Sequence, residues 1–238
     1  RIFGYSFAAV DGRYLINCGE AVMEYEIIAT GSSGNCVIIN GCIAVDMGVP
    51  FKALKGIYKR LKLVLLTHIH SDHFKKATVK RLAKERPCLR FACCEWLLDA
   101  ALACGVDKHN IDVLEIGKKY DYKAFQVSPV LLYHNVPNCG YRIYFGTEKL
   151  FYATDTAHLD GIKAKDYDLY MVEANYGEND IRERIENKRE QDMYAYEANV
   201  PGRHLSFEQA NDFLIENMGK RSDFVYLHQH KGGESNEL

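Results

Sequence analysis

The feature that most constrains the fold is an apolar run that ends in a dense polar cluster. Residues 61–66 read LKLVLL, and residues 67–73 read THIHSDH. A short apolar run of this kind, bounded by polar residues, is typical of a buried strand. His68 and His70 lie two apart where the chain leaves the strand, so their side chains share a face. We therefore expect a buried strand whose end carries chemistry.

The polar cluster has the donor groups of a metal site. His68 and His70 can hold one ion, and Asp72 and His73 follow where a turn can direct them toward a neighbouring ion. Imidazole and carboxylate suit zinc, with manganese or iron as alternatives. The competing interpretation is a polar loop with accidental histidines. Four potential ligands within six residues, directly after a buried strand, favour the metal site.

Composition bounds the class of protein. The chain has 238 residues, 47% hydrophobic and 26% charged, which is typical of a folded protein with a sizeable core. No internal repeat or low-complexity linker divides it, so we expect a single domain over residues 23–238. The net charge of −2 provides no global basic field and argues against tight, indiscriminate duplex binding, although a local basic groove stays compatible with it.

The cysteines and the apolar runs indicate the compartment. None of the eight cysteines forms a C-x-x-C pair, so we interpret them as free, reduced thiols that act as small buried hydrophobes. No apolar run reaches the roughly 18 to 20 residues of a membrane span, and no secretory signal is visible. We predict a cytoplasmic protein without a membrane partner. Residues 1–22 are a leader, a tag, or an extra hairpin turning at Asp11-Gly12.

The pattern of elements predicts a layered α/β architecture. Early β-rich runs are followed by a helical stretch near 51–60 and a helix over 74–86. A strand–helix unit covers 89–105, and Ser206 begins a helix with a near capping box at Gln209. The other expected elements are strands at 111–116, 122–133, 141–146, 149–154, 168–173 and 223–228 and a charged helix over 179–193.

Several motifs together resemble a known family. THIHSDH is similar to the H-x-H-x-D-H signature of the metallo-β-lactamase fold, and the likeness extends over roughly residues 25–232. It continues through TGSSGN at 30–35, VDMG at 45–48, YHNVPNCGYRI at 133–143, YATDT at 152–156, EANY at 173–176 and HLS at 204–206. The combination most resembles the WalJ/YycJ-like branch, related to RNase Z and RNase J. The resemblance implies a four-layer αββα sandwich with two metal ions at the strand ends.

The resemblance also implies a ligand set. His68, His70 and His134 would hold the first ion, while Asp72, His73 and His228 would hold the second. Asp155 would bridge the two ions. His134, Asp155 and His228 each follow a β-like apolar run, as ligands at strand ends must. His230 is a rival of His228.

Other residues receive supporting roles from the same resemblance. His204 would contact the scissile phosphate or protonate the leaving oxygen, and Asp72 or Asp155 would accept a proton from the attacking water. Asp46 would orient a ligand histidine through its ring N–H. The expected substrate contacts are Ser32, Ser33, Asn35 and Arg203, with a plain hairpin turn as the alternative for residues 31–35. Residues 179–203 are a candidate substrate lid, and their interleaved acids also suit a solvated helix.

Two divalent ions at such a site imply phosphodiester hydrolysis, because they lower the pKa of water and neutralise phosphoryl charge. We predict a nuclease for single-stranded or end-exposed nucleic acid. The alternatives are a phosphodiesterase for cyclic or other small nucleotides and, in another class, a metal-binding protein without turnover. A homodimer is compatible with all three.

Overall fold

The structure is a computed structural model, and it describes residues 14–17, 22–191 and 193–229. Two sequence expectations, the hairpin at Asp11-Gly12 and the rival ligand His230, lie outside these residues. Within the described part of the chain, no helix is both long and apolar enough to cross a membrane.

The first sheet has seven strands in sequence order. The first four pair antiparallel, and the pairs from β4 through β7 are parallel. Its strands are β1 (Tyr14–Asn17), β2 (Val22–Ala29), β3 (Cys36–Ile39), β4 (Ile43–Val45), β5 (Leu63–Leu66), β6 (Arg90–Cys94) and β7 (Ile111–Leu114).

The second sheet has six strands in the order β13-β12-β11-β10-β9-β8. The strands from β8 to β11 pair antiparallel, and β11, β12 and β13 run parallel. Its strands are β8 (Tyr120–Asp121), β9 (Gln126–Leu132), β10 (Asn138–Phe145), β11 (Glu148–Ala153), β12 (Leu169–Glu173) and β13 (Asp223–Leu227).

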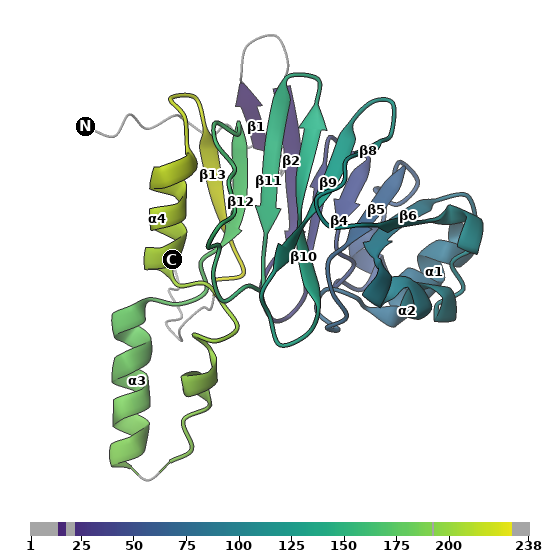
Figure 1. The fold of residues 1–238 in the computed structure, drawn as a ribbon. Coiled ribbons are helices and arrows are strands. Elements are labelled where there is room, and N and C mark those ends of the chain that lie inside the picture. Colours follow the sequence, from purple (N-terminus) through teal and green to yellow (C-terminus); the bar gives the residue numbers. More distant parts are fainter. Residues whose placement is uncertain (1–13, 18–21, 192, 230–238) are drawn as a thin grey trace.

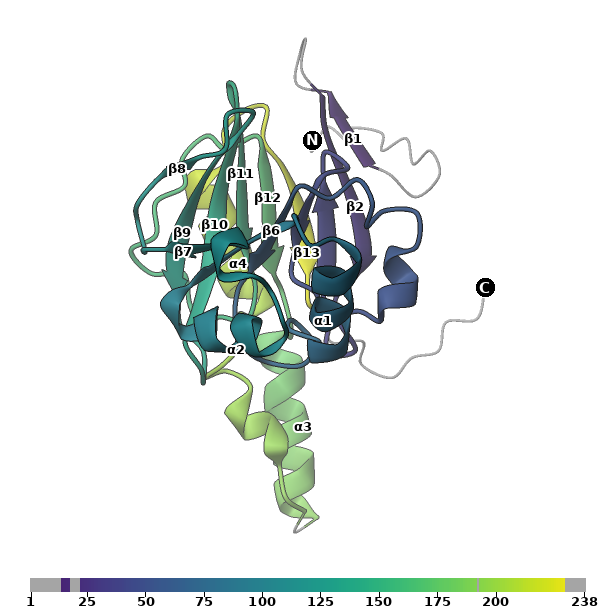
Figure 2. The same cartoon turned by 90° about the vertical axis from the view of Figure 1, so that its right-hand side faces the viewer.

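The two sheets pack face to face, and helices cover their outer faces (Figures 1 and 2). Helices α1 (Lys76–Glu85) and α2 (Leu98–Ala103) lie on the first sheet, and α4 (Phe207–Asn217) lies on the second. The expected four-layer αββα sandwich is thereby confirmed. Short 3₁₀ turns complete the elements: η1 (Phe51–Leu54), η2 (Glu95–Leu97), η3 (Lys108–Asn110) and η4 (Tyr196–Asn199).

Strand β5 explains why its sequence is apolar at every position. Leu63 and Leu65 belong to the core between the two sheets, whereas Val64 and Leu66 belong to the core beneath α1 and α2. A parallel strand with both faces covered has no solvent side on which to place polar residues. The same burial makes β5 a rigid support for the histidine loop that follows it.

The sequence expectations and the structure differ mainly in element lengths. The helical stretch expected near 51–60 contains only the short 3₁₀ turn η1, and the strand expected over 122–133 is shortened to β9, Gln126–Leu132. The expected capping box is confirmed: the Ser206 hydroxyl accepts from the Gln209 N–H at 3.1 Å, and Gln209 Oε1 accepts from the Ser206 N–H at 3.0 Å. Tertiary packing sets where the other elements end.

The seven described cysteines are free, and five of them are buried. Burial raises the pKa of the Cys93 thiol to about 12, which keeps it protonated and unreactive. Cys88 is exposed, so the interpretation as a buried hydrophobe is wrong for that residue.

Helix α3 (Glu178–Glu190) projects away from both sheets, with η4 returning beside it (Figures 1 and 2). Lys188 Nζ lies 2.5 Å from Glu197 Oε1 and ties the two segments together. Tyr194, between them, is exposed. This projecting arm leaves the body directly after β12, at the end of the sandwich where the polar side chains gather.

Candidate metal centre

The sequence-predicted ligands meet at one end of the sandwich although they lie far apart in the chain. The loop after β5 supplies four of them. The others follow strands of the second sheet, His134 after β9, Asp155 after β11 and His228 after β13. Because β11, β12 and β13 are parallel, the residues that follow them meet at the same edge.

Three histidines form the first group of donors. His70 Nδ1 lies 3.2 Å from His68 Nε2 and 3.3 Å from His134 Nε2. One ring nitrogen of each residue belongs to a single compact group in which all donor atoms lie within 4.8 Å of one another. Three imidazole nitrogens converging on one point are a typical arrangement for a divalent transition metal.

Hydrogen bonds at the far side of two rings orient these donors. The Thr67 hydroxyl donates to Asp46 at 2.9 Å, so Thr67 Oγ1 accepts from His68 Nδ1 at 3.0 Å. His134 Nδ1 donates to the Arg203 carbonyl at 2.8 Å. In both rings the Nε2 lone pair is therefore left to face the group. Burial is the main cause that lowers the pKa of His68 to about 2, and the nearby His73 adds to it. The ring is therefore neutral, so its 3.4 Å approach to Asp155 Oδ2 is not an ion pair.

The second group contains Asp72, His73, Asp155 and His228. His73 Nδ1 bonds the buried Asp46 carboxylate at 2.6 Å, as expected for Asp46, and His73 Nε2 faces Asp155 Oδ2. His228 Nε2 is buried and has no hydrogen-bond partner among the described residues. A buried polar atom without a partner costs free energy, which a bound cation would recover.

Asp155 lies between the two groups. Its Oδ2 faces His68 and His73, and its Oδ1 lies 3.0 Å from His228 Nδ1. Asp46, Asp155 and His228 all have left-handed backbone, with φ of 62°, 56° and 51°. Strained backbone of this kind is retained where surrounding structure enforces it, commonly at functional sites.

Glu173 is the site residue that sequence reasoning missed. It is fully buried at the end of β12, and its Oε1 accepts from His204 Nδ1 at 2.6 Å and from His228 Nδ1 at 2.9 Å. Its Oε2 accepts from the N–H groups of Thr156 and Leu205. An acid that closes an otherwise apolar strand, LYMVE, was the available signal.

The carboxylates at this edge favour bound positive charge. Burial lowers the pKa of His204, but the Asp155 carboxylate, 3.2 Å from Nδ1, and the hydrogen bond to Glu173 outweigh that effect and raise the pKa to about 9. Burial likewise opposes a charge on His228, yet Asp72, Glu173 and Asp155 raise its pKa to about 10. Protons on these rings offset the carboxylates, a role that divalent cations would also fill. The donor set and its charge therefore fit metal ions.

A loop from the first sheet fixes Asp72 and His73. Asn35 is buried, and its N–H donates to the Asp72 carbonyl at 2.6 Å while its side-chain amide lies 2.8 Å from His73 Nε2. Asn35 therefore holds this loop, and its contact with a substrate stays a prediction. Ser32 and Ser33, in the same turn, are exposed, and Arg203 is exposed beside His204.

Comparison with known proteins follows the geometry. The family model described as Beta-lactamase superfamily domain matches residues 34–216. The chain belongs to the beta-lactamase superfamily. No curated protein matches the sequence.

Several solved structures share the fold at low sequence identity. The metallo-beta-lactamase fold protein YhfI from Bacillus subtilis has a TM-score of 0.67 and 18% identity, covering 89% of this chain and 88% of that one. The short form of human tRNase Z has a TM-score of 0.64 and 15% identity, covering 87% and 93%. A diphosphatase from the PhnP family has a TM-score of 0.60 and 14% identity, covering 87% and 86%. The superfamily and its fold are thus established, whereas the WalJ/YycJ-like branch stays a prediction.

Proposed function

We propose that this protein is a phosphodiesterase that holds two divalent metal ions and cleaves single-stranded or end-exposed nucleic acid. The observation that carries the proposal is the pair of donor groups that meet at Asp155, with His204 beside them. Two adjoining groups favour a dinuclear centre, which is suited to phosphodiester cleavage.

In this proposal the histidines of the first group, His68, His70 and His134, would hold one ion. Asp72, His73 and His228 would hold the second ion, and Asp155 would serve both. Imidazole and carboxylate donors favour zinc, with manganese or iron as alternatives. When bound, the ions would lower the pKa of an attacking water and stabilise the negative charge that develops on the phosphoryl oxygens.

The remaining steps belong to side chains of this chain. Asp72 or Asp155 accepts the proton that the attacking water releases. His204 donates a proton to the leaving oxygen, and Glu173 holds its Nδ1–H so that Nε2 faces the substrate. The His204–Glu173 pair favours an enzyme rather than a protein that only binds metal. Metal binding alone does not require a proton donor beside the ligands.

The substrate class is supported by the similar structures and by the projecting arm. One similar protein is a tRNase and another is a diphosphatase, so this fold accommodates phosphate esters. In the arm, Arg184 and Arg189 are exposed, whereas Arg182 lies 3.4 Å from Glu178 and Lys188 pairs with Glu197. These internal pairs favour the solvated-helix interpretation of the arm over a phosphate-gripping lid.

Hydrolysis of bis(p-nitrophenyl) phosphate by zinc- or manganese-loaded protein tests the proposal. We expect turnover that is lost in Asp155→Ala and retained in His109→Ala, a matched change on the exposed turn η3. Bound metal without turnover under any metal would contradict the enzyme assignment and favour a metal-binding protein. Labelled single-stranded DNA and RNA, assayed against cyclic mononucleotides, then decide the substrate. Cleavage of the cyclic nucleotides alone would contradict the nuclease assignment.

A further inference from the structure

One segment of the chain is strongly basic, although the chain as a whole has a slightly negative net charge. Residues 51–90 contain 12 of the 30 lysines and arginines but only two of the 32 acids, Asp72 and Glu85. The segment is thus strongly positive within a chain whose net charge is −2. It comprises η1, the turn that follows it, β5, the metal loop and α1.

Six lysines of this segment form what we term the basic face. All six are exposed, and none lies within 4.0 Å of a carboxylate in the part of the chain that the structure describes. They are Lys52, Lys55, Lys59, Lys76, Lys80 and Lys84.

Helix α1 arranges its three lysines as a stripe. Lys76, Lys80 and Lys84 are spaced by four residues and so lie on one side of the helix. The opposite side, through Val79 and Leu82, is buried against the first sheet. The spacing therefore presents three charges to solvent along about 12 Å of helix.

The segment 51–62 lies against α1, which brings the other three lysines beside this stripe. The Arg81 guanidinium lies 4.5 Å from the centre of the Phe51 ring, and Thr78 donates to the Val49 carbonyl at 2.6 Å. Arg86 donates to the carbonyls of Tyr58 and Leu61. These arginines are held by the fold, whereas the six lysines have no such structural role.

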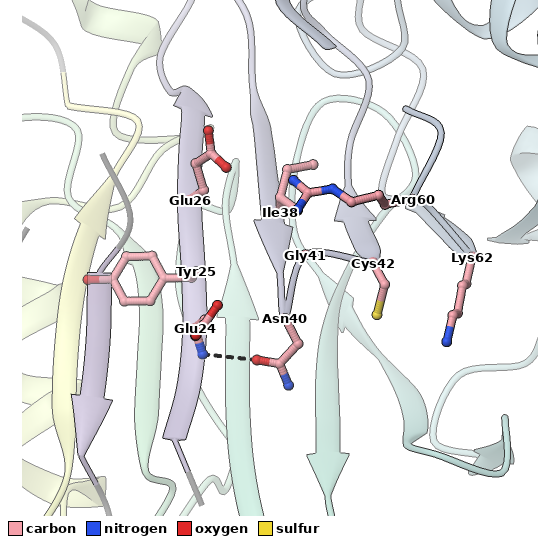
Figure 3. A pocket seen from close by; sticks show the side chains of 9 residues that line it. All are labelled: Glu24, Tyr25, Glu26, Ile38, Asn40, Gly41, Cys42, Arg60 and Lys62. Atoms are coloured by element: carbon pink, nitrogen blue, oxygen red, sulfur yellow. Dashed lines mark hydrogen bonds between the residues drawn. The ribbon is translucent and has the colours of Figure 1, made fainter. Parts of the chain in front are cut away.

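Two nearby cations are excluded because acids offset them. Arg60 and Lys62 line a pocket of about 320 Å³ together with Glu24 and Glu26 (Figure 3). Its mixed charge gives it no preference for an anion, and it carries no part of the inference.

The basic face begins close to the metal centre along the chain. Helix α1 begins at Lys76, three residues after His73, so their Cα atoms are at most about 11 Å apart. Met47 pairs with Phe74, and the Lys75 N–H donates to the Met47 carbonyl, which anchors the start of the helix at the ligand loop. An extended polyanion with one phosphate in the centre can therefore continue onto α1.

We infer that the basic face binds the phosphate backbone of a nucleic-acid strand whose cleaved bond lies in the metal centre. The inference rests on the proposed phosphodiesterase function and selects a polymeric substrate over a mononucleotide. An anionic membrane is the competing partner of a basic helix, but such helices insert large apolar side chains. Among the described residues, no member of the face or of α1 is an exposed large hydrophobic residue.

The test compares two triple variants of the metal-loaded protein. Lys76→Gln, Lys80→Gln and Lys84→Gln together remove the stripe on α1, and glutamine supports a helix nearly as well as lysine. The matched control combines Lys163→Gln, Lys220→Gln and Arg221→Gln, three exposed cations outside the segment. For a labelled single-stranded oligonucleotide near 0.1 M salt, the stripe variant should lose about tenfold or more in kcat/KM, and its log–log salt slope should be shallower by about 2.

Three outcomes keep this inference separate from the proposed function. Both variants should hydrolyse bis(p-nitrophenyl) phosphate like the wild type, and arginine at the three stripe positions should restore oligonucleotide cleavage. Equal effects of the stripe and control variants on the oligonucleotide would overturn the inference while leaving the phosphodiesterase intact. If no variant hydrolyses any ester, oligonucleotide binding measured by fluorescence anisotropy tests the face directly. The inference would also be overturned, in favour of a membrane partner, by a stripe variant that no longer sediments with phosphatidylserine vesicles but binds the oligonucleotide like the wild type.

Discussion

At the scale of single residues, the site depends on which nitrogen of each ring faces inward. Asp46, Thr67, Glu173 and the Arg203 carbonyl each engage one ring nitrogen of a histidine and leave the other for the centre. In other metal sites, mutation of such an outer partner typically lowers metal affinity or activity by roughly 10- to 100-fold.

Glu173→Gln should weaken proton donation by His204. Because Glu173 also holds His228, the metal content of the variant is measured alongside its activity. Without the carboxylate, the raised pKa of His204 falls toward its usual value, and the ring is a weaker acid at neutral pH. We expect kcat to fall by about 10²- to 10³-fold on an oligonucleotide, whose alkoxide leaving group needs a proton. The fall on bis(p-nitrophenyl) phosphate should be small, because p-nitrophenolate leaves without one. Glu216→Gln, on exposed α4 surface, is the control, and equal losses on both substrates would contradict the role of His204.

The raised histidine pKa values also predict how the metal-free protein responds to pH. A ring whose pKa is raised on folding stabilises the folded state fully below its unfolded pKa, about 6.5, and loses that stabilisation as pH rises through the folded value. For His204 and His228 these folded values are about 9 and about 10. The melting temperature of chelated protein should therefore fall between pH 7 and pH 10. His204→Gln should flatten this fall, and parallel profiles for variant and wild type would contradict the assignment.

At the scale of elements, loops from separate strands must approach one another closely at the ligand edge. Gly48, which follows β4, is the tightest point: a Cβ there would lie 1.6 Å from the Asp72 carbonyl oxygen. The Gly48 N–H also donates to the Asn35 carbonyl at 2.9 Å. A side chain at this position would push the Asp72 loop away from the other ligands.

Gly48→Ala should therefore weaken the centre without touching any ligand. We expect metal affinity to drop by about 10- to 100-fold and the free energy of unfolding to fall by about 1–3 kcal/mol. Isothermal titration calorimetry with zinc measures the metal affinity, and unfolding in urea measures the free energy of unfolding. Gly202→Ala is the control, because its nearest neighbour, the Asn199 carbonyl oxygen, would lie at an ordinary 3.9 Å. A Gly48→Ala protein that binds zinc like the wild type would show that the loop has room to move.

At the scale of the whole molecule, the metal centre joins the two sheets. The ligands of the β5 loop belong to the first sheet, and His134, Asp155 and His228 belong to the second. Ions bound there would add links between two layers that already share a core and hydrogen bonds, such as the one from the Tyr141 hydroxyl to the Leu66 carbonyl.

Metal removal should consequently lower the stability of the entire fold. A metal at 100 times its dissociation constant adds about 2.7 kcal/mol to the free energy of unfolding, equivalent to roughly 5–10 °C in Tm for a domain of this size. Differential scanning calorimetry with zinc and with EDTA measures the shift. Asp155→Ala should show much less of it. An EDTA-insensitive wild type would contradict a centre that connects the sheets.

The local part of this protein could be predicted from sequence because its determinants lie within a few residues. The apolar run of β5 with its histidine tip, and the Ser206 capping box, depend on periodicity and on spacings of at most four residues. Element ends were less predictable, since packing cut the stretch at 51–60 to one short turn and shortened the strand expected over 122–133 to β9.

The amino-acid sequence by itself therefore determined a layered α/β class and the first cluster, His68 to His73, whereas the αββα sandwich followed from the resemblance to a known family. Only the tertiary structure showed that Glu173 joins His204 and His228, that Asn35 is buried under the ligand loop, and that the segment 51–62 lies against α1. The physical reason is strand order. Parallel pairing of β11, β12 and β13 brings residues from distant parts of the chain to one edge, and no local pattern encodes which strand ends will be neighbours.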